Sequence, residues 1–122
     1  MKRALYFAMP LAVAIVIAWG AFSSVPPIPK LFEQQDKVEH LLAFGALSFW
    51  LLAALGPRRT VLAACLSVGA AVGLELVQHV LIPSRSGSLA DLSASLMGIV
   101  GALVFVIGVR HVIRNRSAFA AG

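Results

Sequence analysis

The sequence predicts an all-α fold, a polytopic membrane protein built as a bundle of four transmembrane helices. Of its 122 residues, 60% are hydrophobic and only 12% are charged, whereas a soluble domain carries about 25% charged residues. The hydrophobic residues form long unbroken runs, without the alternation of a strand or the stripe of an amphipathic helix. Four runs approach the roughly 20 residues that cross a hydrocarbon core. The length suits a single membrane domain over residues 1–122.

The first span is expected over residues 5–22, directly after Lys2 and Arg3. A cleaved secretory signal peptide is an alternative interpretation, because a basic start, an apolar stretch and small residues near Ala21 and Ser23 are its features. The apolar stretch is long for a signal peptide and the cleavage pattern is imperfect, so we favour an uncleaved helix. The topology of the later spans is the same in both cases.

The other spans are expected over residues 38–55, 60–82 and 90–109. The connection at 23–37 contains three prolines, so its start should be extended rather than helical. Residues 56–59, Gly-Pro-Arg-Arg, predict a tight turn between antiparallel neighbours. Residues 83–88 predict a second short turn, and residues 110–122 a basic tail that frays.

The basic residues predict the orientation in the membrane. With four spans, the side that holds both chain ends carries seven of them: Lys2, Arg3, Arg58, Arg59, Arg110, Arg114 and Arg116. The other side carries three: Lys30, Lys37 and Arg85. Since basic residues are enriched in cytoplasmic loops, both termini are expected in the cytoplasm.

The net charge of +5 does not indicate nucleic-acid binding. The basic residues lie at the ends of apolar runs, where lipid headgroups account for them, and no basic stripe is interleaved with aromatics. Membrane lipids are therefore the expected partners, and homo-oligomerisation stays open. The single cysteine, Cys65, lies in an apolar run and is interpreted as a small buried hydrophobe.

Polar residues at membrane depth are the strongest functional indication. A charge at mid-membrane costs about 2.5–3.5 kcal/mol on insertion scales, so such residues need a reason. The predicted topology brings three groups of them to the outer side: Asp36, Lys37, Glu39 and His40 at the second span, Glu75, Gln78 and His79 at the end of the third, and Arg85 with Asp91 before and in the fourth.

Helical spacing places Glu75, Gln78 and His79 on one face. Small residues predict close helix packing in the third and fourth spans. They are Gly69 and Gly73, Ser67 and Ala71, and then Ala94, Ser95, Gly98, Gly101 and Ala102 on the face that Asp91 heads.

Structural roles are the alternatives for the same residues. Asp36 with Glu39, and Ser88 with Asp91, each fit a helix-capping arrangement. Glu75 could form a buried ion pair with Arg85 or His40, while Gln78 and His79 could simply be solvated. No metal site is predicted, because the zinc-compatible His40, His79, Glu75 and Asp91 match no standard ligand spacing. No cofactor is expected, and no nucleophile-elbow motif is present.

The ordered motifs resemble those of VanZ-like membrane proteins. The opening Asp36-Lys37-x-x-His40-x-x-x-Phe44 is followed by Glu75-x-x-Gln78, Pro83, Arg85, Asp91-Leu92 and Gly98. The resemblance covers about residues 36–101. The family commonly has Asn four residues after the aspartate, where this chain has Ser95.

The resemblance implies a bacterial cell-envelope protein of the cytoplasmic membrane, in a family linked to glycopeptide (teicoplanin) resistance. It implies a site formed by Asp36, Lys37, His40, Glu75, Gln78, Arg85 and Asp91, with Glu39, His79 and Ser95 ranked lower. The first functional hypothesis is binding of an envelope lipid or lipid-linked precursor headgroup. An enzyme with Glu75 or His40 as acid or base is the alternative. A small transporter is disfavoured, because the cytoplasmic half is almost purely apolar.

Overall fold

In the computed structural model, which describes residues 2–23, 29–82 and 88–120, the chain forms four α-helices. They are α1 (Lys2–Phe22), α2 (Gln35–Leu55), α3 (Thr60–Leu81) and α4 (Leu89–Ala120), with a short 3-10 turn, η1 (Pro57–Arg59), between α2 and α3. All four helices are long and apolar enough to cross a membrane. The predicted all-α, four-span class is confirmed.

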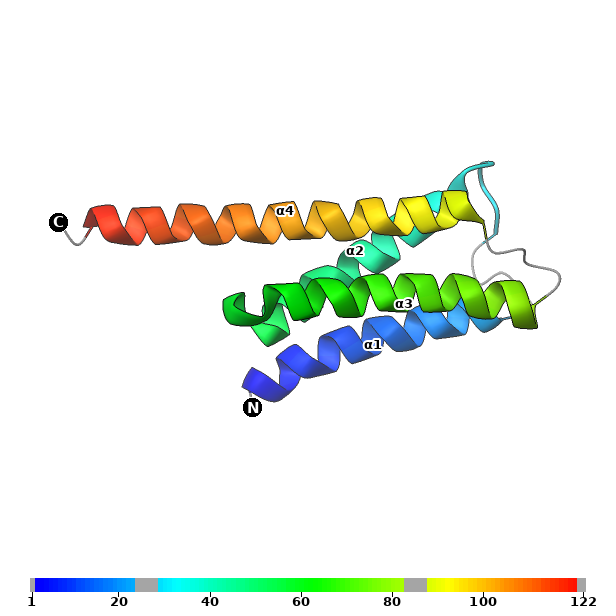
Figure 1. The fold of residues 1–122 in the computed structure, drawn as a ribbon, viewed down its shortest axis with the longest axis horizontal. Helices are drawn as coiled ribbons and strands as arrows, with labels where there is room; N and C mark the ends of the chain where they lie inside the picture. Colours follow the sequence, from blue (N-terminus) through cyan, green and yellow to red (C-terminus); the bar gives the residue numbers. More distant parts are fainter. Residues whose placement is uncertain (1, 24–28, 83–87, 121–122) are drawn as a thin grey trace.

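The helices run alternately up and down, so that both chain ends lie at the same end of the bundle (Figure 1). The central helix is α2, which packs against each of the other three helices and most extensively against α4. We call the end that holds η1 and the chain termini the basic end. The opposite end, formed by the start of α2, the end of α3 and the start of α4, is the polar end.

The closest helix contact joins α2 to α4 through glycine. A Cβ atom built at Gly98 would overlap the carbonyl oxygen of Leu41, and one built at Gly45 would lie 3.3 Å from the carbonyl oxygen of Gly98. The two backbones therefore meet with almost nothing between them. This contact confirms the small-residue prediction for Gly98. Gly69 and Gly101 meet no neighbouring helix, because each points to the outer surface.

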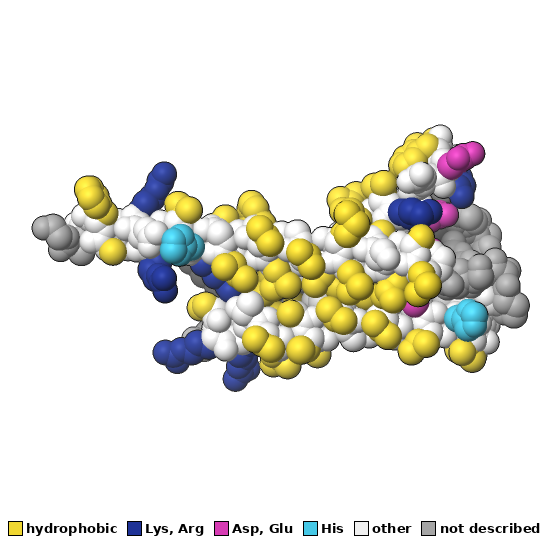
Figure 2. Space-filling model, turned by 45° about the horizontal axis from the view of Figure 1, so that its top comes forward, with side chains coloured by type: hydrophobic (Ala, Val, Ile, Leu, Met, Phe, Trp, Pro, Cys, Tyr) yellow, Lys and Arg dark blue, Asp and Glu magenta, His cyan; other side chains and the backbone are white. Residues whose placement is uncertain are grey.

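The buried core is small. One cluster consists of Phe44, Leu47, Ala71 and Ile99, and a second of Leu52, Ala63 and Val106. Large apolar side chains are exposed on all four helices, which is the surface that lipid covers in a membrane protein (Figure 2). Cys65 lies on this exposed surface of α3, so the prediction that it is buried is wrong. In an apolar solvent, an apolar side chain loses little by facing outward.

Five helix boundaries differ from their predictions. Helix α1 begins at Lys2 rather than at residue 5, and helix α4 begins at Leu89 rather than at residue 90. Helix α2 begins at Gln35 rather than at residue 38, so the polar residues 35–40 are already helical. Helix α3 ends at Leu81, one residue early. Helix α4 continues to Ala120, and the tail expected to fray is helical. No glycine or proline interrupts residues 109–120, and Ser117 donates to the carbonyl of Ile113 within the helix at 3.0 Å.

At the basic end, Arg110 of α4 forms hydrogen bonds to both α2 and α3. Its guanidinium donates to the carbonyl oxygen of Leu52 at 2.6 Å and to the hydroxyl of Thr60 at 3.3 Å. The helix C-terminus leaves carbonyl groups without intrahelical partners and carries a partial negative charge, so a cation there is stabilising. Gly56 follows with φ 76°, a left-handed conformation that glycine adopts freely, and begins the predicted tight turn.

We expect Gly98→Ala to destabilise the bundle by about 1–3 kcal/mol, the usual effect of overpacking, because its methyl group would overlap α2 at Leu41. Thermal unfolding of the purified protein in detergent measures this change. Gly101→Ala on the same helix is the matched control, since its Cβ meets no atom within 4 Å. An equal fall in both variants would contradict the close contact.

Candidate functional site

The polar end gathers every acidic residue of the chain. The sequence has five, Glu33, Asp36, Glu39, Glu75 and Asp91, and the helix directions place all of them toward this end. On the face shown in Figure 2, acidic side chains appear only there, whereas many of the Lys and Arg side chains lie at the basic end. The basic end is therefore cationic, whereas the polar end contains the acidic groups.

Three helices bring His40, Glu75 and Asp91 together. The ring nitrogens of His40 and the carboxylate oxygens of the two acids offer atoms that all lie within 4.8 Å of one another. His40 Nε2 is 3.8 Å from Glu75 Oε1, which is too long for a hydrogen bond. We call these three residues the three-helix cluster. The sequence predicted that the second, third and fourth spans bring polar residues together, and this is confirmed for these three residues.

Glu75 is the most enclosed member of the cluster, with only 9% of its surface exposed. Neither of its carboxylate oxygens has a hydrogen-bond partner among the described residues, and neither does Nδ1 of His40. The backbone N–H of Ser88 approaches the carboxylate without satisfying either oxygen. Buried polar groups in proteins are nearly always paired, so these unpaired atoms call for an explanation.

Local structure fixes Asp91 and His40 in place. The hydroxyl of Ser88 accepts a hydrogen bond from the Asp91 backbone N–H at 3.0 Å, which confirms Ser88 as the cap of α4. Ser95 donates to the carbonyl oxygen of Asp91 one turn later, also at 3.0 Å. The His40 ring packs edge-on against Phe44, with ring centroids 6.3 Å apart. The capping bond uses the backbone N–H of Asp91, and its carboxylate lies close to that of Glu75 and to the ring of His40.

Asp36 lies outside the cluster. Its carboxylate pairs with Lys30 at 3.3 Å, and both side chains are about 60% exposed (60% and 61%). The residue that precedes α2 is Gln34, which makes no side-chain capping bond, so the prediction that Asp36 and Glu39 cap this helix is wrong. The helix starts earlier than predicted, and Asp36 therefore falls within its first turn.

Gln35 is the polar residue that the sequence did not single out. It is buried, and its side chain accepts from the Leu31 backbone N–H at 2.6 Å. It donates to the Pro29 carbonyl at 3.2 Å and to Glu39 Oε1 at 2.8 Å. Gln35 thus fastens the preceding segment onto α2 and engages Glu39. A lone glutamine beside charged neighbours gives no sequence signal for this role.

The other residues that the sequence predicted for the site differ in how deeply they are buried. Gln78 is buried one turn beyond Glu75, while His79 is exposed and outside the cluster. Lys37 is half-buried, one turn before His40 on α2. Ser95 is buried and bonded to its own helix, so it does not replace an amide donor to the site. Arg85 and the rest of the turn at 83–87 lie outside the described residues.

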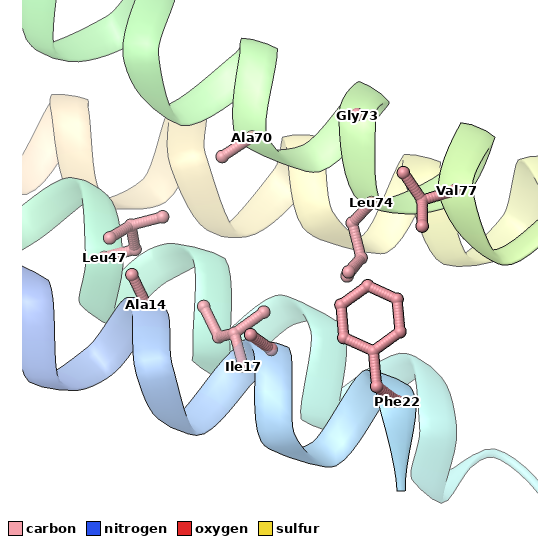
Figure 3. Close-up of a pocket in the computed structure, with 9 residues that line it drawn as sticks. Ala14, Ile17, Phe22, Leu47, Ala70, Gly73, Leu74 and Val77 are labelled. Carbon is pink, nitrogen blue, oxygen red and sulfur yellow. The ribbon is translucent and has the colours of Figure 1, made fainter.

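An apolar groove lies on the other side of α3. It has a volume of about 240 Å³ and lies between α1, α2 and α3, as Figure 3 shows. Its lining comprises Ala14, Ile17, Ala18 and Phe22 of α1, Leu47 of α2, and Ala70, Gly73, Leu74 and Val77 of α3. The lining has no polar side chain that would orient a ligand. The groove therefore suits a lipid chain rather than a polar substrate.

Fold and site together define a multi-pass membrane protein with a polar, partly enclosed cluster at one end of a four-helix bundle. No protein-family model, curated protein or solved structure matches the chain. The resemblance to VanZ-like proteins accordingly rests on the motif residues themselves.

We expect Gln35→Ala to speed amide hydrogen exchange at Leu31 by about 2- to 13-fold, corresponding to the roughly 0.5–1.5 kcal/mol that one hydrogen bond contributes. Asp36→Asn is the matched control, because an exposed ion pair contributes about 0–1 kcal/mol. Mass-spectrometric exchange over residues 29–35 measures both. Faster exchange in Asp36→Asn than in Gln35→Ala would mean that the ion pair of Asp36 with Lys30, and not Gln35, holds this segment against α2.

Proposed function

We propose that this protein is a bacterial cell-envelope membrane protein that binds the headgroup of an envelope lipid or lipid-linked precursor at its polar end. In this proposal the polar end faces the outside of the cytoplasmic membrane. The seven-to-three distribution of Lys and Arg supports that orientation. The resemblance to VanZ-like proteins supports the envelope role and adds altered teicoplanin susceptibility as the expected phenotype.

The unpaired carboxylate of Glu75 is the observation that carries the proposal. It lies six residues before the end of α3, or about 9 Å along the helix axis at 1.5 Å per residue. A buried polar group without a partner costs about 1–3 kcal/mol, and a charged one costs more. Ionisable residues at membrane depth are usually retained for function. A ligand that donates hydrogen bonds to Glu75 would offset this cost.

In this proposal, different residues contact different parts of the headgroup. Glu75 and Asp91 would accept hydrogen bonds from hydroxyl or amine groups, and Lys37 and Arg85 would neutralise an anionic group. Gln78, buried beside Glu75, offers an amide that can both donate and accept. The groove between α1 and α3 reaches Phe22 and Val77 near the polar end and provides apolar surface for an acyl chain.

We expect Glu75→Gln to lose a specific copurifying envelope lipid while its melting temperature is unchanged or raised. The amide keeps the shape of the carboxylate but removes a buried acidic group whose oxygens have no hydrogen-bond partner among the described residues. Lipid mass spectrometry and thermal unfolding of the protein purified in detergent measure the two quantities. Binding sites that are held at a cost to stability behave in this way.

Glu33→Gln is the control for this experiment, because it removes an acidic charge from the same end at an exposed position. It should leave both the lipid and the melting temperature unchanged. A large fall in the melting temperature of Glu75→Gln, with the lipid retained, would identify Glu75 as part of a structural ion pair with His40. That result would contradict headgroup binding through Glu75.

General acid–base catalysis is the second candidate function. A histidine and a carboxylate 3.8 Å apart in a partly enclosed site are the residue types that such catalysis uses. If the protein turns over a lipid-linked glycan, Glu75→Gln should lower the rate by about 100-fold or more. Turnover assays on the purified protein measure this rate. An unchanged rate in the variant would contradict the acid–base role.

A further inference from the structure

We propose that His40, Glu75 and Asp91 form a binding site for one divalent transition-metal ion of the Zn²⁺ type. The sequence spacing gave no such indication, since the residues lie 35 and 16 positions apart in the chain. The fold brings one imidazole and two carboxylates from three different helices within 4.8 Å of one another. These are the nitrogen and oxygen ligand types that zinc takes in proteins.

The distance between His40 and Glu75 suits two ligands that share one ion. Ligands about 2.0–2.2 Å from zinc lie about 3.4 Å apart in tetrahedral geometry and at most about 4.3 Å apart. His40 Nε2 and Glu75 Oε1, at 3.8 Å, are within that range. The widest pair of the cluster, up to 4.8 Å, needs rotation of one carboxylate. Asp91 is only half-buried, so its carboxylate has room to rotate.

The unpaired atoms are an independent indication of a ligand. Glu75 is buried, and both of its oxygens lack partners among the described residues. Its carboxylate also faces a second one, that of Asp91, and like charges so close together repel. Across the described residues, no Lys or Arg forms an ion pair with either acid. A divalent cation between the two acids would convert this repulsion into attraction.

Imidazole in the ligand set decides which ions fit. Mg²⁺ and Ca²⁺ prefer all-oxygen sites, whereas imidazole favours zinc and its first-row neighbours. With three protein ligands, a four-coordinate ion keeps one position for water or a ligand group. Phe44, which packs against the His40 ring, would hold the imidazole in place.

Zinc binding by the full-length protein in lipid-free detergent tests the site. After treatment with a chelator and dialysis, the protein should bind one Zn²⁺ per chain, measured by calorimetry and elemental analysis. Loss of a residue that only hydrogen-bonds to a metal ligand weakens metal binding by about 10–100-fold. His40→Ala and Asp91→Asn should therefore weaken zinc binding by at least about 100-fold. Zinc should raise the melting temperature of the parent protein but not of these variants.

His79→Ala is the matched control, because it removes an exposed histidine from the same end of the bundle. It should bind zinc as the parent does. The site is wrong if the parent binds no zinc, if His79→Ala loses zinc while Asp91→Asn keeps it, or if Mg²⁺ displaces zinc at equal concentration. Because no lipid is present, these outcomes are independent of the headgroup proposal. The conservative Asp91→Asn variant keeps the test valid even if His40→Ala does not fold.

Discussion

The backbone contact between α2 and α4 is the constraint on which the rest of the structure depends. Gly98 presses against the carbonyl of Leu41 and lies beside Gly45, so the separation of the two helices is set by main-chain atoms. In a membrane, lipid tails remove the hydrophobic driving force between helices, and close van der Waals packing takes its place. His40 immediately precedes Leu41, and Asp91 lies two turns before Gly98. The contact therefore also sets how far apart α2 and α4 hold the side chains of His40 and Asp91.

The two ends of the bundle differ in whether their polar side chains have hydrogen-bond partners. At the basic end, Arg110 bonds to the carbonyl of Leu52 and the hydroxyl of Thr60, so its donors close the end of α2. At the polar end, Gln35 satisfies its neighbours in a similar manner, but Glu75 and His40 retain atoms without partners among the described residues. Among the described residues, Glu75 is the buried carboxylate whose two oxygens both lack hydrogen-bond partners, and this is the observation on which the proposed ligand rests.

The candidate site was predictable in part. The residues of the three-helix cluster could be named because ionisable side chains are rare in apolar runs, and because four antiparallel spans force three of the polar segments to one end. Asp36 lies outside the three-helix cluster, since it falls in the first turn of α2 and its carboxylate pairs with Lys30. Gln35 was missed, because an uncharged side chain next to several charged ones shows its role only through its three hydrogen bonds. Small residues alone did not separate Gly98, which meets α2, from Gly101, which faces outward.

The sequence by itself determined the four spans, their alternating directions and the end of the bundle at which the acidic residues gather. These features depend on local hydropathy, on proline and glycine in the turns, and on the cost of placing charge in lipid, all of which act along the chain. The tertiary structure alone decided that His40, Glu75 and Asp91 lie within one ion's reach while Asp36 and His79 do not. Rotation of each helix about its axis is fixed by packing against its neighbours, at Gly98 above all, and no local property of the sequence specifies that rotation.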